Sequence, residues 1–298
     1  MNFDKLNTVS KNLKFNEPMK NHTTFRIGGN ADVFVSPKSI DELARVISVC
    51  KSENYPCLVV GNGSNMLVSD KGIRGVVIHI GKDLSDCRVD GDTVYAQSGI
   101  LMSALSAKLL EHSLSGFERL SGIPGTLGGG IFMNAGAYGG ELSEFIKSVE
   151  YLDGMGEIKS ADADKLCFGY RTSIFQKEGW IILSATMQFK KGNADDIKKE
   201  ISEYRNRRNE KQPIELPSAG SVFKRPEGHF AGKLIQDANL MGYTIGGAQV
   251  STKHAGFIVN TGNATAQDVL DLIEYIKKTV LDKFGVELEP EIRLIGER

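Results

Sequence analysis

The stretch that decides the fold reads Ser121-Gly122-Ile123-Pro124-Gly125-Thr126-Leu127-Gly128-Gly129-Gly130-Ile131-Phe132-Met133-Asn134-Ala135-Gly136-Ala137-Tyr138-Gly139-Gly140. Glycine occupies eight of the nineteen positions from 122 to 140, and large apolar residues are interleaved with it. A flexible linker would carry serine and charge instead. We therefore expect an ordered backbone that lacks side chains where another group lies against it, such as a dinucleotide. The alternative is tight packing of a helix on a sheet, which needs only one or two glycines.

The composition is that of an ordinary globular protein with about two domains. The chain has 298 residues, of which 41% are hydrophobic and 24% are charged. Its 36 Lys and Arg balance 37 Asp and Glu, so the formal net charge is −1. These values exclude collagen, coiled coils and wholesale disorder. A chain with a net charge so close to zero is also a poor candidate for binding nucleic acid or an anionic membrane.

The sequence predicts a cytoplasmic protein. Residues 1–15 are polar and contain no apolar segment of the kind found in secretory signals. The longest mostly apolar stretch, residues 180–189, is too short to cross a membrane. The four cysteines form no C-x-x-C pair, and we expect them to be small buried residues in a reducing compartment: Cys50, Cys57, Cys87 and Cys167.

Apolar periodicity predicts a mixed α+β fold without a regular βαβ rhythm. Strands are expected at 31–35, 58–60, 66–68, 76–80, 93–97, 149–152, 181–189 and 256–259, and helices at 41–53, 101–112, 195–208 and 233–239. Thr265 and Asp268 form a capping box that predicts a further helix to about residue 283. The composition shifts near residue 191, which suggests a domain boundary.

Gly61-Asn62-Gly63-Ser64-Asn65 follows an apolar strand. Such a turn can point successive N–H groups at a phosphate, or it can be a tight hairpin, and the segment alone does not decide between the two. It is not a Rossmann fingerprint, because Met66 stands where the third glycine belongs and a strand follows. The sequence also contains no Walker A motif.

Several residues with useful chemistry carry little meaning one by one. Ser221 lies in a loop without an adjacent His, so serine-hydrolase chemistry has little support. Arg171 and Glu291, taken alone, read as surface charges. The five histidines are scattered without metal-ligand spacing, and we predict no metal site.

Seven short motifs taken together resemble the UDP-N-acetylenolpyruvoylglucosamine reductase family, over residues 20–296. In chain order they are Thr24-Phe25-Arg26-Ile27-Gly28-Gly29, Gly61 to Asn65, Ser121-Gly122-Ile123-Pro124-Gly125, Asn134-Ala135-Gly136-Ala137-Tyr138-Gly139-Gly140-Glu141, Tyr170-Arg171, Ser218-Ala219-Gly220-Ser221 and Leu288-Glu289-Pro290-Glu291. The sequence departs from the usual family residues at Asn30 and Arg225. Only 49 residues separate Arg171 from Ser221, which resembles the shorter form of the family without a Tyr-bearing insertion.

The resemblance implies an α+β fold with a two-part FAD-binding region of the vanillyl-alcohol-oxidase (PCMH) type and an α+β substrate domain. We expect the FAD-binding region over residues 1–191, with subdomains of about 1–80 and 81–191. The UDP-sugar domain is expected over 192–298, with a C-terminal tail that returns to the active site.

The resemblance also implies a reaction. NADPH would reduce FAD, and hydride from flavin N5 would then add to the enolpyruvyl group of UDP-N-acetylglucosamine-enolpyruvate, giving UDP-N-acetylmuramate for peptidoglycan synthesis. Arg171 and Glu291, the latter protonated, would stabilise the enolate-like intermediate. Ser221 matches the proton donor.

Further residues are assigned by the same resemblance. The positions expected to bind FAD are Gly61, Asn62, Gly63, Ser64, Asn65, Ser121, Gly122, Ile123, Pro124 and Gly125. Those expected near the UDP-sugar are Tyr170, Lys211, Arg225, His254 and Arg293. The partners implied are small molecules, and the sequence leaves the oligomeric state open. Two alternatives stay open: another FAD-linked oxidase or dehydrogenase on the same fold, and a non-catalytic FAD module.

Overall fold

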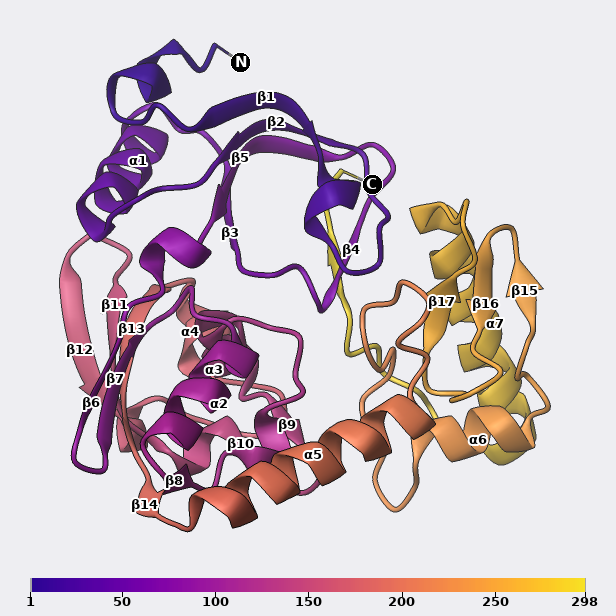
Figure 1. Ribbon diagram of the computed structural model, residues 1–298. Coiled ribbons are helices and arrows are strands. Elements are labelled where there is room, and N and C mark those ends of the chain that lie inside the picture. The colour runs from indigo at the N-terminus through magenta and orange to yellow at the C-terminus, as the bar shows by residue number, and fades with distance from the viewer. Residues whose placement is uncertain (1, 298) are drawn as a thin grey trace. The chain divides into compact units, whose positions relative to one another are not determined.

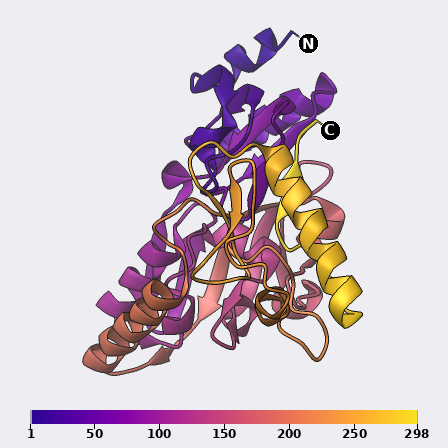
Figure 2. The same ribbon diagram turned by 90° about the vertical axis from the view of Figure 1, so that its right-hand side faces the viewer.

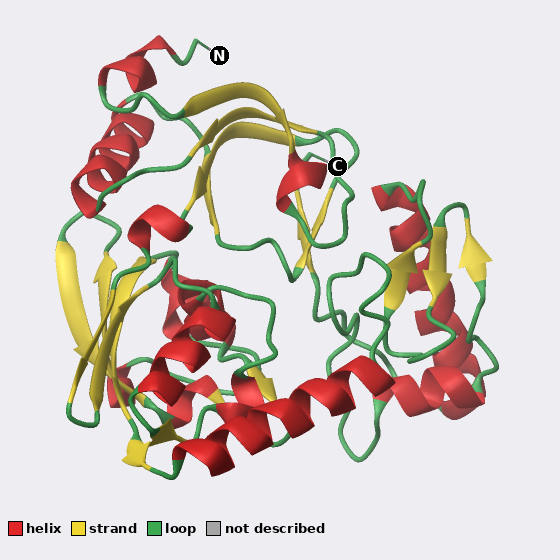
Figure 3. Cartoon of the chain, viewed as in Figure 1, coloured by secondary structure: helices red, strands yellow, loops and turns green. Residues whose placement is uncertain are grey.

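A computed structural model describes residues 2–297 of the chain. The chain forms two compact units, each of which is described by itself. Unit 1 comprises residues 1–14, 33–62 and 75–207, and unit 2 comprises residues 15–32, 63–74 and 208–298. Helices and strands alternate irregularly in both, in agreement with the predicted α+β class (Figure 3). The expected division into an FAD-binding region and a UDP-sugar domain stays a prediction.

A four-stranded sheet contributes the whole of β3 and parts of its other strands to the first part of unit 1. The strand order is β1-β2-β5-β3, with β1 at Leu13–Pro18, β2 at Asn30–Val35, β5 at Ile73–His79 and β3 at Cys57–Val60. The helix α1 (Ile40–Ser52) begins at Ser39, whose side chain accepts a hydrogen bond from the Glu42 N–H. Its buried face consists of Leu43, Val46, Ile47 and Cys50, which confirms the predicted helical spacing.

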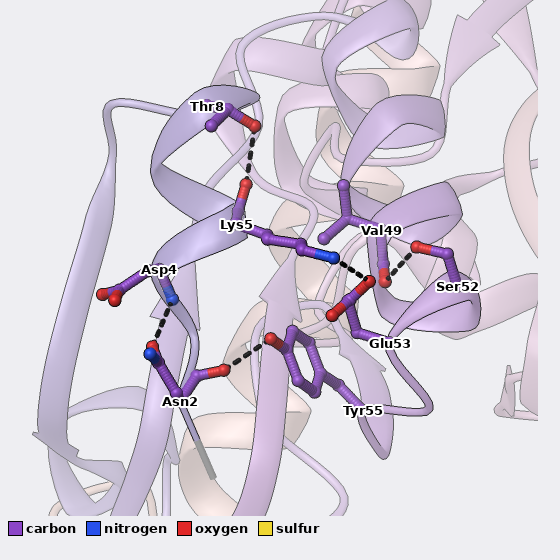
Figure 4. Close-up of polar contacts among 8 residues, drawn as sticks. All are labelled: Asn2, Asp4, Lys5, Thr8, Val49, Ser52, Glu53 and Tyr55. Atoms are coloured by element: carbon purple, nitrogen blue, oxygen red, sulfur yellow. Dashed lines mark hydrogen bonds and ion pairs between the residues drawn. The ribbon is translucent and has the colours of Figure 1, made fainter.

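The N-terminal segment packs beside the end of α1. Leu6, in a short 3₁₀ helix (Asp4–Thr8), is fully buried. Lys5 Nζ pairs with Glu53 Oε1 at 2.7 Å, and the Tyr55 hydroxyl donates to the Asn2 carbonyl at 2.5 Å (Figure 4). Phe3 and Leu6 lie in one apolar cluster with the buried face of α1, so the segment belongs to the core of unit 1.

The second part of unit 1 is an antiparallel five-stranded sheet covered by helices on one face (Figure 1). The strand order is β12 (Ile158–Asp162), β11 (Ile146–Leu152), β13 (Ile181–Gln188), β7 (Thr93–Gln97) and β6 (Cys87–Asp90). The helices are α2 (Met102–Glu111), α3 (Leu127–Met133) and α4 (Ile174–Glu178), and the long α5 (Ala194–Lys211) follows the sheet. Two small strand pairs complete this part: β8 (Leu114–Ser115) with β14 (Lys190–Lys191), and β9 (Gly136–Ala137) with β10 (Gly140–Glu141).

Unit 2 joins three distant segments of the chain in one core. Its largest helix, α7 (Ala266–Phe284), is seen along its length in Figure 2 and buries one apolar face. It packs with α6 (Ala231–Asp237) and with the sheet β15-β16-β17 (Thr244–Ile245, Ala248–Val250 and Ile258–Asn260). Phe25 and Leu67 lie in the same core and tie residues 15–32 and 63–74 to it.

A second link in unit 2 joins the segment 63–74 to α7. The Asp70 carboxylate accepts hydrogen bonds from the backbone N–H groups of Ala266 (2.8 Å) and Gln267 (3.1 Å). The N–H groups in the first turn of a helix have no partner within the helix, and negative charge is favoured there. Asp70 provides both an acceptor and a negative charge. The strand β4 (Met66–Val68) also pairs in parallel with β18 (Arg293–Ile295).

The glycine-rich stretch is ordered, as expected, and contains a helix that the sequence analysis did not predict. Residues 127–133 form α3, which begins at Thr126 and ends at Asn134 in the left-handed conformation, with φ of 42°. Glycine has a low helix propensity, so the periodicity of this stretch does not predict a helix. Tertiary packing stabilises the helix in spite of this low propensity, because Leu127, Gly130 and Ile131 are buried.

The prediction for the cysteines is right for one of the four and wrong for two others. Cys50 is buried in α1, whereas Cys57 and Cys167 are exposed and Cys87 is half-buried. Cys57 stands at the first position of an exposed strand end, where packing does not require an apolar side chain. Among residues 2–297, no helix is long and apolar enough to cross a membrane.

The predicted capping box of α7 is present and gives a test of unit 2. The Thr265 hydroxyl accepts from the Asp268 N–H, while Asp268 Oδ2 accepts from the N–H groups of Thr265 (2.9 Å) and Gly247 (3.1 Å). These hydrogen bonds hold the pKa of Asp268 below its ordinary value. Asp268 therefore stabilises the fold above its ordinary pKa, and this contribution is lost as the pH falls through the lowered value.

We predict that Asp268→Ala lowers the free energy of unfolding by about 1 kcal/mol at pH 7, measured by urea denaturation. The deficit should be the same at pH 5 and should shrink below about pH 4. Asp271→Ala, on the exposed side of the same helix, serves as the matched control, with a change of less than about 0.5 kcal/mol. A pH-independent deficit would contradict the role assigned to the carboxylate.

Candidate active site

In unit 1, two of the segments expected to bind the cofactor lie side by side. The side chain of Asn62 donates to the Pro124 carbonyl at 2.7 Å. A Cβ atom at Gly61 would collide with the Thr126 hydroxyl, so only glycine permits this approach. The structure thus brings Gly61 and Asn62 against the segment 121–125, in which Ser121 Oγ donates to the Glu118 carbonyl at 2.7 Å.

Protein packing explains some glycines of the glycine-rich stretch but not all of them. A Cβ at Gly128 would lie 2.8 Å from Ser98 Cβ, and one at Gly130 would lie 3.1 Å from Leu142. A Cβ at Gly129 would meet only the Thr126 hydroxyl, at 3.5 Å, which is ordinary contact. Packing of α3 therefore requires Gly128 and leaves the backbone of Gly129 open to another group.

The same region holds a buried polar atom without a partner among the described residues. Ser98 Oγ is buried and makes no hydrogen bond, although the Ser98 carbonyl accepts from the Gly128 N–H at 2.8 Å. Unpaired buried hydroxyls are uncommon in folded proteins. Together with the close approach at Gly61 and the open backbone at Gly129, this donor fits a polar cofactor such as a flavin nucleotide.

The rest of the 61–65 loop belongs to unit 2. Gly63 has a φ of 61°, and its carbonyl accepts from the Thr24 N–H at 3.2 Å. The loop leads into β4, which pairs with β18 and not with β3. The hairpin interpretation of this loop is therefore wrong, and the strand predicted after Asn65 is confirmed.

Ser221 and Glu291 are brought together in unit 2 by three adjacent extended segments. The Val222 N–H donates to the Gly256 carbonyl at 2.9 Å, and the Val222 carbonyl accepts from the Glu291 N–H at 2.7 Å. Val222 is buried in the core while Ser221, next to it, is exposed. The alternation along an extended segment thus turns the Ser221 side chain away from the core.

The 63–65 segment lies beside the same position. Asn65 Nδ2 donates to the Glu291 carbonyl at 3.2 Å, and the Asn65 carbonyl accepts from the Arg293 N–H at 3.0 Å. Arg293 begins β18 opposite Met66. One segment expected to bind the cofactor is therefore held against the segment that carries Glu291.

The remaining unit 2 residues assigned to the UDP-sugar have different surroundings. The guanidinium of Arg225 stacks on Phe230 at 4.0 Å, and its Nε donates to the His229 carbonyl at 3.3 Å. Lys211 is the exposed last residue of α5. These two cations stand on the surface of unit 2, where they can meet an anion.

His254 is held as a neutral ring. Its Nδ1 accepts a hydrogen bond from the Gly256 N–H at 3.1 Å, so the neutral ring carries its proton on Nε2. The edge of Phe257 lies against it, with ring centroids 5.0 Å apart. Burial lowers the pKa of His254 from its ordinary value. His254 therefore offers a neutral N–H donor at physiological pH.

Arg171 and Tyr170 lie in unit 1. Arg171 has a φ of 56°, which is uncommon for a residue other than glycine. Its guanidinium donates to the Gly136 carbonyl at 3.1 Å and lies 4.9 Å from the centre of the half-exposed Tyr170 ring. The Arg171 carbonyl in turn accepts from Gln176 Nε2 at 3.0 Å.

Two residues that position this arginine have no role in the sequence-based assignment. Gln176 also donates to the Phe132 carbonyl at 2.8 Å. The buried Asn134 donates to Glu141 at 2.9 Å and to the Gly169 carbonyl at 3.0 Å, and it accepts from the Ser143 N–H. The motif around Asn134 could have indicated a polar hub, whereas Gln176 lies outside every motif.

Two family models match large parts of the chain. Residues 31–162 match the model of an FAD binding domain, and residues 212–295 match the C-terminal domain of UDP-N-acetylenolpyruvoylglucosamine reductase. A curated protein of that name from Caldanaerobacter subterraneus is 52% identical over 297 residues, covering 99% of this chain and 98% of the relative. Another from Clostridioides difficile is 50% identical over 293 residues, covering 98% and 96%.

A crystal structure extends the similarity to the fold. The UDP-N-acetylenolpyruvylglucosamine reductase of Thermus caldophilus has a TM-score of 0.81 and 32% identity, over 95% of this chain and 97% of that one. The expected α+β fold with an FAD-binding region is confirmed, and FAD is its cofactor. The resemblance carried by the seven motifs is likewise confirmed, and the chain belongs to the UDP-N-acetylenolpyruvoylglucosamine reductase family.

Proposed function

We propose that this protein reduces the enolpyruvyl group of UDP-N-acetylglucosamine-enolpyruvate to give UDP-N-acetylmuramate, with NADPH as the source of electrons. The observation that carries the proposal is the juxtaposition of Ser221 and Glu291 on neighbouring backbone segments. A proton donor and a group that stabilises negative charge are the two functions that the second half of this reaction requires. Membership of the reductase family supports the same substrate.

The chain binds and orients the flavin, and the flavin provides the redox chemistry. Bound FAD, reduced by NADPH, would supply the hydride for the terminal carbon of the enolpyruvyl double bond. In unit 1, the segments 61–62 and 121–125 and the open backbone at Gly129 hold and orient the flavin nucleotide. In unit 2, the segment 63–65 has the same function.

Arg171 and Glu291 stabilise the charge that develops on the substrate. Addition of hydride moves electron density toward the carboxylate and creates an enolate-like intermediate. A fixed cation and a hydrogen-bond donor lower the energy of such an anion most when they are already oriented. The hydrogen bonds from Arg171 to Gly136 and from Gln176 to Arg171 support such a fixed orientation.

Ser221 donates the proton that completes the reduction. The carbon next to the ether oxygen becomes strongly basic once its neighbour has received hydride, so a weakly acidic hydroxyl can protonate it. Ser221 is exposed and follows Gly220, which has a φ of 78° and therefore permits a sharp turn before the serine.

The UDP-sugar is bound by cations and one neutral donor. Lys211, Arg225 and Arg293 attract its diphosphate by charge, and guanidinium groups bind phosphate oxygens well. His254 donates from Nε2, and the half-exposed ring of Tyr170 offers an apolar face to the substrate.

The first test follows the visible spectrum of the purified protein loaded with FAD. We expect NADPH to bleach the flavin bands and anaerobic addition of the enolpyruvyl UDP-sugar to restore them. Oxygen should be a poor substitute for the UDP-sugar. Rapid reoxidation by oxygen alone, without a response to the UDP-sugar, would indicate an oxidase, and the absence of any reduction by NADPH would indicate a non-catalytic FAD module.

A second prediction concerns the proton donor. Ser221→Ala should bind FAD and be reduced by NADPH at the normal rate, because neither step uses the hydroxyl. Reoxidation by the UDP-sugar should slow roughly 100-fold or more. Stopped-flow absorbance separates the two half-reactions. Ser218→Ala, in the same loop, should react like the unmodified protein, and a normal second half-reaction in Ser221→Ala would refute the assignment.

A third prediction concerns the positioning of Arg171. Gln176→Leu removes the donor to the carbonyls of Arg171 and Phe132 and loosens the turn that orients the guanidinium. We expect the second half-reaction to slow about tenfold, while reduction by NADPH is unaffected. Gln267→Leu, on the exposed surface of α7, is the matched control. Equal slowing of both half-reactions would indicate a general structural defect instead.

A further inference from the structure

A polar recess in unit 2 has no part in the function proposed above. It has a volume of about 390 Å³ and is lined by Lys20, Asn21, Thr23 and Arg26. The Thr23 hydroxyl donates to the Ile27 carbonyl at 3.1 Å and is thus occupied. The other lining residues, Lys20, Asn21 and Arg26, all carry hydrogen-bond donors, and two of them are cations.

The positive charge of this recess is not neutralised by the protein around it. Among residues 2–297, neither Lys20 nor Arg26 forms an ion pair with an acidic side chain. The nearest acidic residue in sequence, Glu17, pairs with His22 at 2.7 Å. Two cations that share a recess without a counter-charge repel each other, and an anion bound there would relieve this repulsion.

Arg26 has a left-handed backbone conformation. Its φ is 56°, and its N–H closes a turn by donating to the Thr23 carbonyl at 3.2 Å. This conformation costs free energy at a residue other than glycine or asparagine, and such residues are enriched at functional sites.

The recess also adjoins the loop of residues 61–65, to which FAD binding is assigned above. The Thr24 N–H donates to the Gly63 carbonyl at 3.2 Å. A Cβ atom at Gly63 would collide with the carbonyl of His22. The segments 20–26 and 63–65 therefore lie in direct backbone contact. A phosphate held by residues 63–65 would thus lie beside the segment that carries Lys20 and Arg26.

We propose that Lys20, Asn21 and Arg26 form a phosphate subsite that binds the diphosphate of FAD. This inference rests on the proposed function only for the placement of the flavin nucleotide against residues 61–65. Cationic side chains add charge-assisted hydrogen bonds to those that a glycine-rich loop offers through its backbone. The subsite would thus determine how tightly the flavin nucleotide is held, without taking part in the transfer of hydride.

The test measures binding of FAD to the full-length apoprotein by quenching of flavin fluorescence. The variant Lys20→Gln/Arg26→Asn removes both charges, and asparagine tolerates the left-handed backbone at position 26. We expect the Kd for FAD to rise about tenfold at low salt. The difference should shrink at high salt, because screening weakens attraction between charges. Arg26→Lys should retain most of the affinity.

Lys278→Gln is the control. It removes one positive charge from the exposed surface of α7 and should leave the Kd for FAD unchanged. An unchanged Kd for FAD together with a raised KM for NADPH would overturn the assignment and place the phosphate of the nicotinamide nucleotide in the recess. No change in either constant would overturn the subsite altogether. If the unmodified protein binds FAD but does not reduce the UDP-sugar, the proposed function fails while the FAD titration still decides the subsite.

Discussion

In unit 2 the N–H of Arg293 donates to the carbonyl of Asn65 at 3.0 Å, and the side chain of Asn65 donates to the carbonyl of Glu291. These bonds begin the parallel pairing of β4 with β18. More than two hundred residues of chain lie between the two partners, far more than the dozen or so that a parallel connection requires. The placement of Glu291 beside the 63–65 segment depends on this register, and the hydrogen bond from the Glu291 N–H to the Val222 carbonyl then places Ser221 next to Glu291.

Arg171 illustrates a different way of fixing a functional group. It lies outside regular secondary structure, where a side chain would ordinarily sample many orientations. Hydrogen bonds from Asn134 and Gln176 hold the surrounding turn, and the Gly136 carbonyl holds the guanidinium itself. In the proposed reaction, a polar network of this kind would lower the cost of orienting the charge of Arg171.

The sequence predicted best those elements whose signals are local. The apolar face of α1 and the Thr265 capping box depend on residues three or four positions apart, and both are present. The helix α3 was missed because glycine opposes helix formation and distant packing overcomes it. The exposed positions of Cys57 and Cys167 contradict a burial preference that holds only on average.

The candidate site shows the same division. Family motifs identified Ser221 and Glu291, but no periodicity could indicate that the N–H of Glu291 donates to the residue after Ser221. Gln176 could not be predicted, because a glutamine that binds two carbonyls looks like any surface glutamine in a sequence. The cations at positions 20 and 26 acquire meaning only when the recess and the backbone contact with Gly63 are known.

The division of the chain between the two units has a consequence for synthesis on the ribosome. All of unit 1 has been made once residue 207 has emerged, whereas the core of unit 2 needs Ile292, close to the C-terminus. Residues 15–32 and 63–74, with the apolar side chains of Phe25 and Leu67, must therefore wait through most of translation without their partners. During that interval they are exposed to aggregation and to chaperones, and a chain that ends before α7 would lack a large part of the core that buries them.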